Sequence, residues 1–328
     1  MPEKYTMKAL LRPKSGSADH LKLSNVERPV ITDDCVLVKV RAASVNAADW
    51  HMLHSGGVAG AIAWALRVSV PPICGSDLAG VVEDVGKRVT AFKPGDEVFG
   101  SGLGSFAEYT LATEDRLARK PAQLSFEEAA ALPIAGVTAL QGLRDKAHVR
   151  PGQKVLVYGA GGGVGTFAVQ VATALGGLVT AVTSTSNLEI VQTLGAHEVV
   201  DYTQEDVTSR NVRYDVIFDV AAVRSLGDLT RILEPDGTLV LAGAAKGSML
   251  DLVGRLAAAQ LRARVRGQHV FSFLAHVTQA DLEALAGLAQ ARKVRPAIDR
   301  EYSLQEAGAA IGYLGTGHAR AKVVITGM

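Results

Sequence analysis

The sequence has little cysteine, since Cys35 and Cys74 are the only two among 328 residues. Two thiols are too few for the disulfide framework of a small secreted domain, and a structural zinc lobe requires four thiolates. The composition therefore excludes both kinds of stabilisation. It fits a protein kept in a reducing, cytoplasmic environment.

An excess of charge of one sign is also missing, because 34 basic residues face 33 acidic ones and the net charge is +1. We therefore expect neither a nucleic acid nor a membrane as the main partner. The most apolar stretch, residues 58–70, is interrupted by Arg67 and is too short to span a bilayer. We interpret it as a loop or short helix over a pocket, or as core packing. The polar N-terminus has no signal-peptide pattern.

The chain is long enough, and with 48% hydrophobic residues apolar enough, for two domains with cores of their own. Its first third is β-rich and punctuated by glycines, which predicts a small, irregular barrel. Pro94-Gly95-Asp96 predicts a turn, because Pro presets φ and Gly accepts positive φ. Strands are expected at residues 35–41, 78–86, 92–100 and 106–110, and a last strand at 322–325 returns to this domain.

The pattern changes near residue 125. Ser125 and Glu128 have the spacing of a capping box and begin an alanine-rich helix, and from Gly152 onward strands and helices alternate. Alternation of this kind predicts an α/β fold with a parallel, doubly wound sheet covered on both faces. The expected strands are residues 155–158, 178–182, 198–201, 216–220, 238–242 and 264–267, and the expected helices include residues 188–194, 226–233 and 281–292.

A glycine-rich turn follows the first of these strands and begins a helix. Gly159, Gly162 and Gly165 are spaced three residues apart, with Gly163 and Val164 between the last two. Glycine lets the backbone turn tightly and lets a pyrophosphate approach without interference from Cβ, while the helix N-terminus offers unpaired N–H groups. The strand before the turn and the helix after it favour a dinucleotide-binding site over a merely flexible turn.

The next strand indicates which dinucleotide. Sites for NAD usually carry Asp or Glu at its end, about 20 residues past the turn, to bind the ribose 2′-hydroxyl. This chain has Thr183 and Ser184 there. Small hydroxyl side chains leave room for a 2′-phosphate and donate hydrogen bonds to it. The sequence therefore favours NADPH, and a polar turn without a phosphate role is the alternative.

Seven motifs follow one another along the chain, at residues 77–86, 92–100, 159–165, 194–196, 200–202, 233–240 and 318–324. Together they are similar to those of the quinone oxidoreductase (zeta-crystallin-like) group of the medium-chain dehydrogenase/reductase family, and the resemblance covers essentially the whole chain. It implies a GroES-like, β-rich catalytic domain built from residues 1–124 and 293–328, and a Rossmann domain at 125–292. It also implies an active site in the cleft where they meet and a homodimer formed through edge strands of the nucleotide-domain sheet.

The resemblance also implies positions for the cofactor. Ser184 and Tyr202 would lie near the adenosine 2′-phosphate, and Thr138 would face the nicotinamide. Ala242 and Phe271 complete the expected cofactor-binding set. Many relatives carry a lysine a few residues past Ser184, whereas this chain has Asn187 and Leu188 there.

The zinc ligands of related alcohol dehydrogenases are all replaced, so we expect no metal. Their C-x-x-D, G-H-E and Cys-Gly segments correspond here to residues 46–49, 75–77 and 135–136, which read Asn-Ala-Ala-Asp, Gly-Ser-Asp and Ala-Gly. Without a Lewis acid, hydride transfer is easiest to a quinone or another conjugated carbonyl, because the added charge can spread. Asn46 is the candidate for orienting substrate or nicotinamide; a structural hydrogen bond in a turn is the alternative.

Other functions stay open. Reductases of 2-enoyl thioesters tend to carry a tyrosine soon after the Asn-x-x-Asp segment, where this chain has Trp50 and His51. A non-enzymatic, NADPH-dependent binding protein of the zeta-crystallin type is a further alternative. Trp50, Trp64, Phe271 and the apolar residues 60–70 suggest a small hydrophobic acceptor. Tyr109 and His269 are weaker candidates for a proton donor.

Overall fold

The computed structural model describes residues 5–12, 21–54, 72–243 and 266–328, and the apolar segment at 60–70 with Trp64 lies outside them. The chain divides into two compact units. Unit 1 comprises Met1–Ala135, Val277–Gln290 and Pro296–Met328, and unit 2 comprises Gly136–His276 and Ala291–Arg295. None of the helices in the described ranges is both long and apolar enough to cross a membrane.

Unit 1 is built on a seven-stranded sheet and also contains a separate, two-stranded antiparallel sheet. The large sheet has the order β14-β15-β3-β4-β5-β7, and β6 pairs with β3. The core of unit 1 contains Val36, Val38 and Val40, which alternate along β3, together with Val323 and Ile325 of β15 and with Phe106, and all of these side chains are fully buried. The strands of unit 1 are β1 (Thr6–Leu11), β2 (Lys22–Glu27), β3 (Cys35–Val45), β4 (Asp77–Val85), β5 (Glu97–Ser101), β6 (Tyr109–Thr113), β7 (Leu117–Arg119), β14 (Ile298–Ser303) and β15 (Lys322–Thr326).

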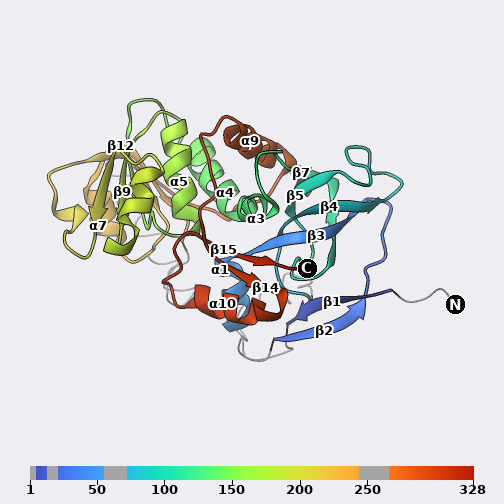
Figure 1. Ribbon diagram of the computed structural model, residues 1–328. Coiled ribbons are helices and arrows are strands. Elements are labelled where there is room, and N and C mark those ends of the chain that lie inside the picture. Colours follow the sequence, from blue (N-terminus) through green and yellow to red (C-terminus); the bar gives the residue numbers. More distant parts are fainter. Residues whose placement is uncertain (1–4, 13–20, 55–71, 244–265) are drawn as a thin grey trace. The chain divides into compact units, whose positions relative to one another are not determined.

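The two ends of the chain meet in this sheet. β15 pairs antiparallel with β3, with Val323 opposite Val45, which confirms the predicted return of the last strand to the N-terminal part. Figure 1 shows the red strand β15 beside the blue strand β3, and α10 beside α1. In the described ranges, the α-helices of unit 1 are α1 (Ala47–His54), α3 (Phe126–Ala131), α9 (Gln279–Gln290) and α10 (Ala307–Gly315).

Two of the predicted strands begin later than expected. β5 starts at Glu97 because Pro94 and Gly95 form the predicted turn, with Gly95 at a φ of 91°. β6 starts at Tyr109 because Phe106 pairs elsewhere: its carbonyl accepts from the N–H of Leu10 and its own N–H donates to Cys74.

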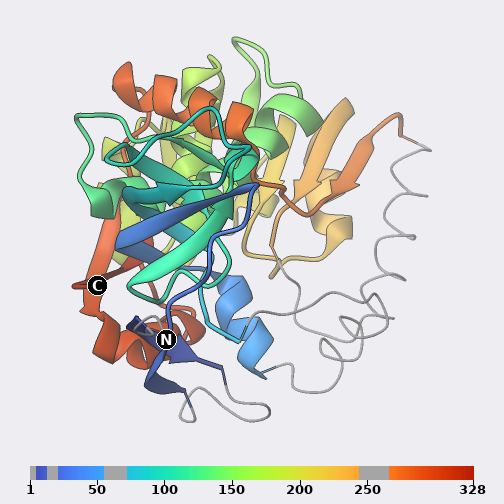
Figure 2. The same ribbon diagram turned by 90° about the vertical axis from the view of Figure 1, so that its right-hand side faces the viewer.

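Unit 2 is a six-stranded sheet in which all neighbouring strands are parallel. Its order is β10-β9-β8-β11-β12-β13, so the chain order of these strands reads 3-2-1-4-5-6, the order of the Rossmann fold. Figure 2 shows the yellow to orange strands β11 to β13 side by side. The strands are β8 (Lys154–Tyr158), β9 (Leu178–Thr183), β10 (Glu198–Asp201), β11 (Tyr214–Asp219), β12 (Leu233–Leu241) and β13 (His269–Ser272).

The helices of unit 2 include α5 (Gly163–Ala174), α6 (Leu188–Thr193) and α7 (Leu226–Arg231), and α4 (Pro133–Leu140) belongs to it from Gly136 onward. Of the strand predicted at 264–267, residues 264 and 265 lie outside the described ranges, and the prediction was wrong for the other two. Arg266 and Gly267 form a turn, with Gly267 at a φ of 70°, and the strand follows at His269–Ser272. A residue with positive φ cannot continue a β-strand.

The units do not coincide with the domain boundaries expected after residues 124 and 292, which stay predictions. The capping box at Ser125 is present as predicted, with the Ser125 hydroxyl bonded to the N–H of Glu128. The helix that it begins, α3, packs against β3, β4 and β15 and is therefore counted in unit 1. α9 is counted there because it contacts β7.

Candidate active site

The glycine-rich turn joins the carboxyl end of β8 to the first residue of α5. Gly159 has a φ of 89°, which directs the chain away from the strand, and its N–H and that of Ala160 both donate to the carbonyl of Val182. Gly162 caps the helix without a side chain, and Gly163 and Val164 form its first turn. The N–H groups at this end have no partner within the helix, so they can bind an anion.

Three glycines of the turn meet different surroundings. A Cβ on Gly165 would lie 2.1 Å from the carbonyl oxygen of Gly159, and one on Gly161 would lie 2.5 Å from both the Thr183 hydroxyl and the Asn187 amide nitrogen. A Cβ on Gly162 would meet only one atom, 3.6 Å away. Gly161 and Gly165 are therefore required by the fold, whereas the space beside Gly162 is open to a ligand.

The residues predicted to contact the 2′-phosphate lie together at the ends of β9 and β10. Thr183 is opposite Asp201 in the strand pair, and the N–H of Tyr202 donates to the carbonyl of Thr183 at 3.0 Å. Thr183 is buried, Ser184 is half-buried, and Tyr202 is 52% exposed. The Ser184 hydroxyl lies 3.1 Å from that of Ser186.

A carboxylate next to this group was missed by the sequence reasoning. Asp201 accepts hydrogen bonds from the Thr185 hydroxyl at 2.5 Å and from the N–H and hydroxyl of Thr203 at 2.9 and 2.8 Å. These bonds, above all the one from Thr185, lower the pKa of Asp201. The carboxylate thereby fastens the turn after β9 to the end of β10. The signal was an Asp followed two residues later by a hydroxyl residue, the pattern of an Asx turn.

The remaining predicted cofactor residues also lie in unit 2. Ala242 follows β12, and its N–H donates to the carbonyl of Asp219 at the end of β11. Phe271 is on β13 next to Val240 and is partly exposed, and Thr138 is buried in α4. Ala242 therefore lies at the carboxyl ends of the strands, where parallel sheets bind nucleotides.

A cluster of buried polar side chains surrounds Asn46 in unit 1. Asn46 joins β3 to α1, and Asp49 in the first turn of α1 accepts from the backbone N–H of Asn46 at 2.8 Å. The Asn46 amide nitrogen donates to Asp77 at 2.8 Å, and Lys322 Nζ donates to the amide oxygen of Asn46 at 2.8 Å. Asp77 also accepts from the Ser44 hydroxyl at 2.9 Å.

The strand register assembles this cluster. Ser44 is opposite Asp77 in the β3–β4 pair, and Val45 is opposite Val323 in the β3–β15 pair, which places Lys322 beside Asn46. Lys322 and Asp77 were missed as site residues, because nothing in the local sequence around 322 indicates a buried lysine. A lysine at the start of a strand otherwise lies in solvent.

Charge in the Asn46 cluster does not balance, since two carboxyl groups face one ammonium. Burial is the main influence on all three groups. It raises the pKa of Asp49 to about 6. It also raises the pKa of Asp77, opposed chiefly by Lys322, and lowers that of Lys322, opposed chiefly by Asp77. The attraction between Lys322 and Asp77 thus offsets part of the cost of burying each of them.

The two weaker candidates for a proton donor, Tyr109 and His269, make ring contacts with neighbouring side chains. The Tyr109 ring lies under the Arg28 guanidinium, 3.7 Å from its centroid, and His269 stacks with Phe271 at a centroid distance of 6.5 Å. Trp50, expected in an acceptor pocket, packs on α10: a Cβ on Gly315 would lie 1.9 Å from its indole nitrogen.

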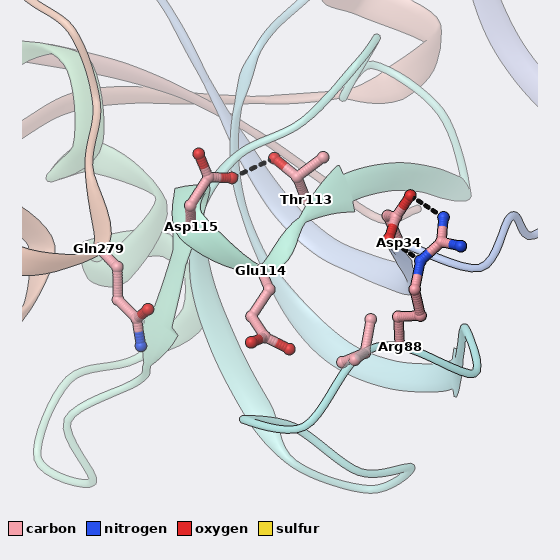
Figure 3. Close-up of a pocket in the computed structure, with 7 residues that line it drawn as sticks. Asp34, Arg88, Thr113, Glu114, Asp115 and Gln279 are labelled. Carbon is pink, nitrogen blue, oxygen red and sulfur yellow. Dashed lines mark hydrogen bonds and ion pairs between the residues drawn. The ribbon is translucent and has the colours of Figure 1, made fainter.

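A surface pocket of about 310 Å³ lies elsewhere in unit 1. Figure 3 shows Asp34 paired with Arg88, and Glu114 and Asp115 on the turn after β6. Glu114 already accepts from the N–H groups of Thr90 and Ala91, at 2.7 and 3.2 Å. The carboxylates of this pocket therefore hold turns in place, and we assign no chemistry to the pocket. Over the described part of the chain, no group of three or more His, Cys, Asp or Glu side chains could hold a metal ion.

Comparisons with known proteins agree with this architecture. Residues 32–122 match the alcohol dehydrogenase GroES-like domain, and residues 194–325 match the zinc-binding dehydrogenase family. The chain is 36% identical to 2-methylene-furan-3-one reductase of Solanum lycopersicum, over 97% of this chain and 79% of that protein. It is 33% identical to the chloroplastic NADPH-dependent alkenal/one oxidoreductase of Arabidopsis thaliana, with the same coverage.

Solved structures show the same likeness. The quinone oxidoreductase from Coxiella burnetii superimposes with a TM-score of 0.85 at 29% identity, covering 99% of this chain and all of that one. A GroES-like N-terminal part, a parallel sheet in Rossmann order and curated relatives above 30% identity all lead to one conclusion. This chain belongs to the medium-chain dehydrogenase/reductase family.

Proposed function

We propose that this protein is an NADPH-dependent reductase that transfers a hydride to a quinone or another conjugated carbonyl without zinc. The observation that carries the proposal is the glycine turn before α5, where Gly162 leaves open space at a helix N-terminus. The names of the relatives, which include reductases of enones, alkenals and quinones, support the class of acceptor.

The residues present fit a dinucleotide. The turn from Gly159 to Gly165, with Gly163 and Val164 in the first helical turn, would hold the pyrophosphate. Ser184 and Tyr202 would contact the 2′-phosphate, with Thr183 supporting them, and Thr138, Ala242 and Phe271 complete the proposed set. Bound NADPH would supply the hydride.

Asn46 is the proposed orienting residue for the acceptor. One of its amide N–H groups is used by Asp77, and among the described residues the other has only the carbonyl of Ser44, at 3.5 Å. That distance is too long for a strong hydrogen bond, so this N–H is available to a carbonyl oxygen that gains negative charge. The proton that completes the reduction would come from solvent or from a positioned side chain.

The donor set of the Asn46 cluster does not fit a zinc ion. Zinc sites in proteins are formed mainly by thiolate and imidazole ligands, and this cluster contains neither. It contains the Lys322 ammonium instead, 2.8 Å from the Asn46 oxygen and 3.7 Å from Asp77. A second cation beside the ammonium would be repelled.

The test is an assay of NADPH oxidation by the purified chain with an ortho-quinone and with an α,β-unsaturated ketone, after treatment with a metal chelator. We expect turnover with both and little with a saturated ketone. An inactive protein across a panel of quinones and enones, or activity that the chelator abolishes and zinc restores, would contradict the proposal. Turnover of 2-enoyl thioesters in preference to both acceptors would favour the alternative reductase function.

The preference for NADPH has its own test in Ser184→Asp. A carboxylate at the end of β9 would repel the 2′-phosphate and replace a hydrogen bond to a charged group, worth about 1.5–3 kcal/mol. The dissociation constant for NADPH, measured by fluorescence titration, should rise about tenfold or more, and that for NADH should change little. Equal losses for both dinucleotides would place the 2′-phosphate elsewhere.

A homodimer in the cytoplasm completes the proposal. β13 is the last strand of its sheet in the described part of the chain, and its side chains His269 and Phe271 are exposed. An exposed edge can pair with a second copy. Both cysteines are unpaired, which agrees with a reducing compartment. Binding of RNA by a catalytically inactive chain would favour the zeta-crystallin-type alternative.

A further inference from the structure

Lys322 is the least expected member of the Asn46 cluster. Its residue is 2% exposed, and its ammonium donates to the amide oxygen of Asn46 at 2.8 Å and to the carbonyl of Val45 at 3.3 Å. The oxygen of Asp77 lies 3.7 Å away. Burying an ammonium costs free energy unless it is paired and hydrogen-bonded. A lysine buried only for packing would not need these contacts.

The contacts of Lys322 and Asp77 determine how the Asn46 amide is turned. An ammonium can only donate hydrogen bonds, and an ionised carboxylate can only accept them. The amide oxygen therefore faces Lys322 and the amide nitrogen faces Asp77. With the amide reversed, its nitrogen would face an ammonium and its oxygen a carboxylate, and both contacts would be repulsive.

We propose that Lys322 and Asp77 are positioning residues that hold the Asn46 amide with one N–H directed to the carbonyl oxygen of the acceptor. This inference rests on the proposed reductase function and deepens it. The ammonium also polarises the amide through its oxygen, which strengthens the N–H as a donor. Neither residue is required to touch the acceptor or the dinucleotide.

The test is a double-mutant cycle between Lys322→Met and Asn46→Ala. We measure kcat and KM for an ortho-quinone at saturating NADPH, and the dissociation constant for NADPH. Each single variant should lower kcat/KM for the quinone about tenfold or more, while NADPH affinity stays within about twofold. Because Lys322 acts through Asn46, the double variant should be no slower than Asn46→Ala alone.

Lys120→Met is the matched control. Lys120 also lies in unit 1, and its side chain is 5% exposed, donates to the carbonyl of Leu124 at 2.7 Å and pairs with Glu97, without a contact to Asn46. It should leave kcat/KM for the quinone unchanged. Asp77→Asn, which keeps the shape of the side chain, is the second arm if Lys322→Met does not fold, and its loss should likewise vanish in an Asn46→Ala background.

The outcomes separate this inference from the function beneath it. A wild-type chain that reduces neither quinones nor enones overturns the proposed function and the positioning role with it. A wild-type chain that is active, combined with losses that multiply in the double variant, overturns the positioning role alone. Losses in NADPH affinity that match those in kcat/KM would also overturn it, because they indicate a general structural defect.

Discussion

Gly162 and Gly165 belong to the same glycine-rich segment, but the space beside their Cα atoms differs. At Gly165 a methyl group would collide with the carbonyl oxygen of Gly159, 2.1 Å away. We expect Gly165→Ala to lower the free energy of unfolding by about 1–3 kcal/mol, the usual cost of overpacking. At Gly162 the nearest atom is 3.6 Å away, so Gly162→Ala should cost less than about 1 kcal/mol.

In the folded variants, NADPH affinity should fall more for Gly162→Ala than for Gly165→Ala. The methyl group of Gly162→Ala fills the space proposed for the pyrophosphate, and the dissociation constant for NADPH should rise about tenfold, or about 1.4 kcal/mol. Chemical denaturation and fluorescence titration measure the two quantities. Tight NADPH binding by Gly162→Ala would show that the pyrophosphate does not use this turn.

Asp49 should make the stability of the protein depend on pH. Burial raises the pKa of its carboxyl from 3.8 to about 6 in the folded state. Between these values the folded state holds a proton that the unfolded state has released, so stability falls as pH rises from about 4 to about 6. The loss amounts to about 3 kcal/mol at most, since each unit of pKa corresponds to about 1.4 kcal/mol.

Asp49→Asn removes this titration and keeps an acceptor for the N–H of Asn46. Urea midpoints measured from pH 4 to pH 7 should fall less steeply for the variant than for the wild type. Asp115→Asn, at an exposed turn of the same unit, is the control and should follow the wild-type curve. Parallel curves for Asp49→Asn and wild type would mean that Asp49 is ionised throughout.

At the scale of elements, Gln170 joins α5 to a distant segment of unit 2. Its amide nitrogen donates to the carbonyls of Thr166 and Arg295, both at 3.0 Å, and its oxygen accepts from the N–H of Arg295 at 2.7 Å. Gln170→Glu keeps the acceptor, loses both donors and buries a charge. We expect the free energy of unfolding to fall by about 1–3 kcal/mol at neutral pH.

Denaturation at two pH values gives the decisive measurement for Gln170→Glu. Protonation of the introduced carboxyl restores one donor and removes the charge, so the difference from the wild type should shrink at pH 4. Gln290→Glu, at an exposed position of α9, is the control and should change the free energy of unfolding by less than about 0.5 kcal/mol. An equal loss at both pH values would attribute the effect to packing instead.

Elements with a local signal could be predicted from the sequence, and contacts set by register could not. β10 was predicted at its observed bounds, because a short apolar segment there is enclosed by turn residues. The glycine turn was placed because its spacing carries a steric requirement. Lys322 was missed, since its burial depends on the pairing of β15 with β3, from opposite ends of the chain. The strand that includes Gly267 was predicted wrongly, because the positive φ of Gly267 is visible only in the structure.

At the scale of the whole molecule, the two edges that the unit 2 sheet has in the described residues differ in charge. At the β10 edge, Glu198 forms an ion pair with Arg210 at 2.7 Å, and charged groups on an edge discourage pairing with another chain. β13 has the sequence His-Val-Phe-Ser and carries no Asp, Glu, Lys or Arg. We therefore expect the proposed dimer to form through β13.

Light scattering after size exclusion tests this directly. The wild type should have twice the chain mass of 34.3 kDa. Phe271→Lys places a charge on the partly exposed face of β13, where it would oppose its symmetry-related copy, so the mass should fall toward that of the monomer. Glu198→Gln at the other edge should leave the dimer intact. If Glu198→Gln rather than Phe271→Lys dissociates the protein, the second copy is bound at β10, and the absence of charge on β13 has a different cause.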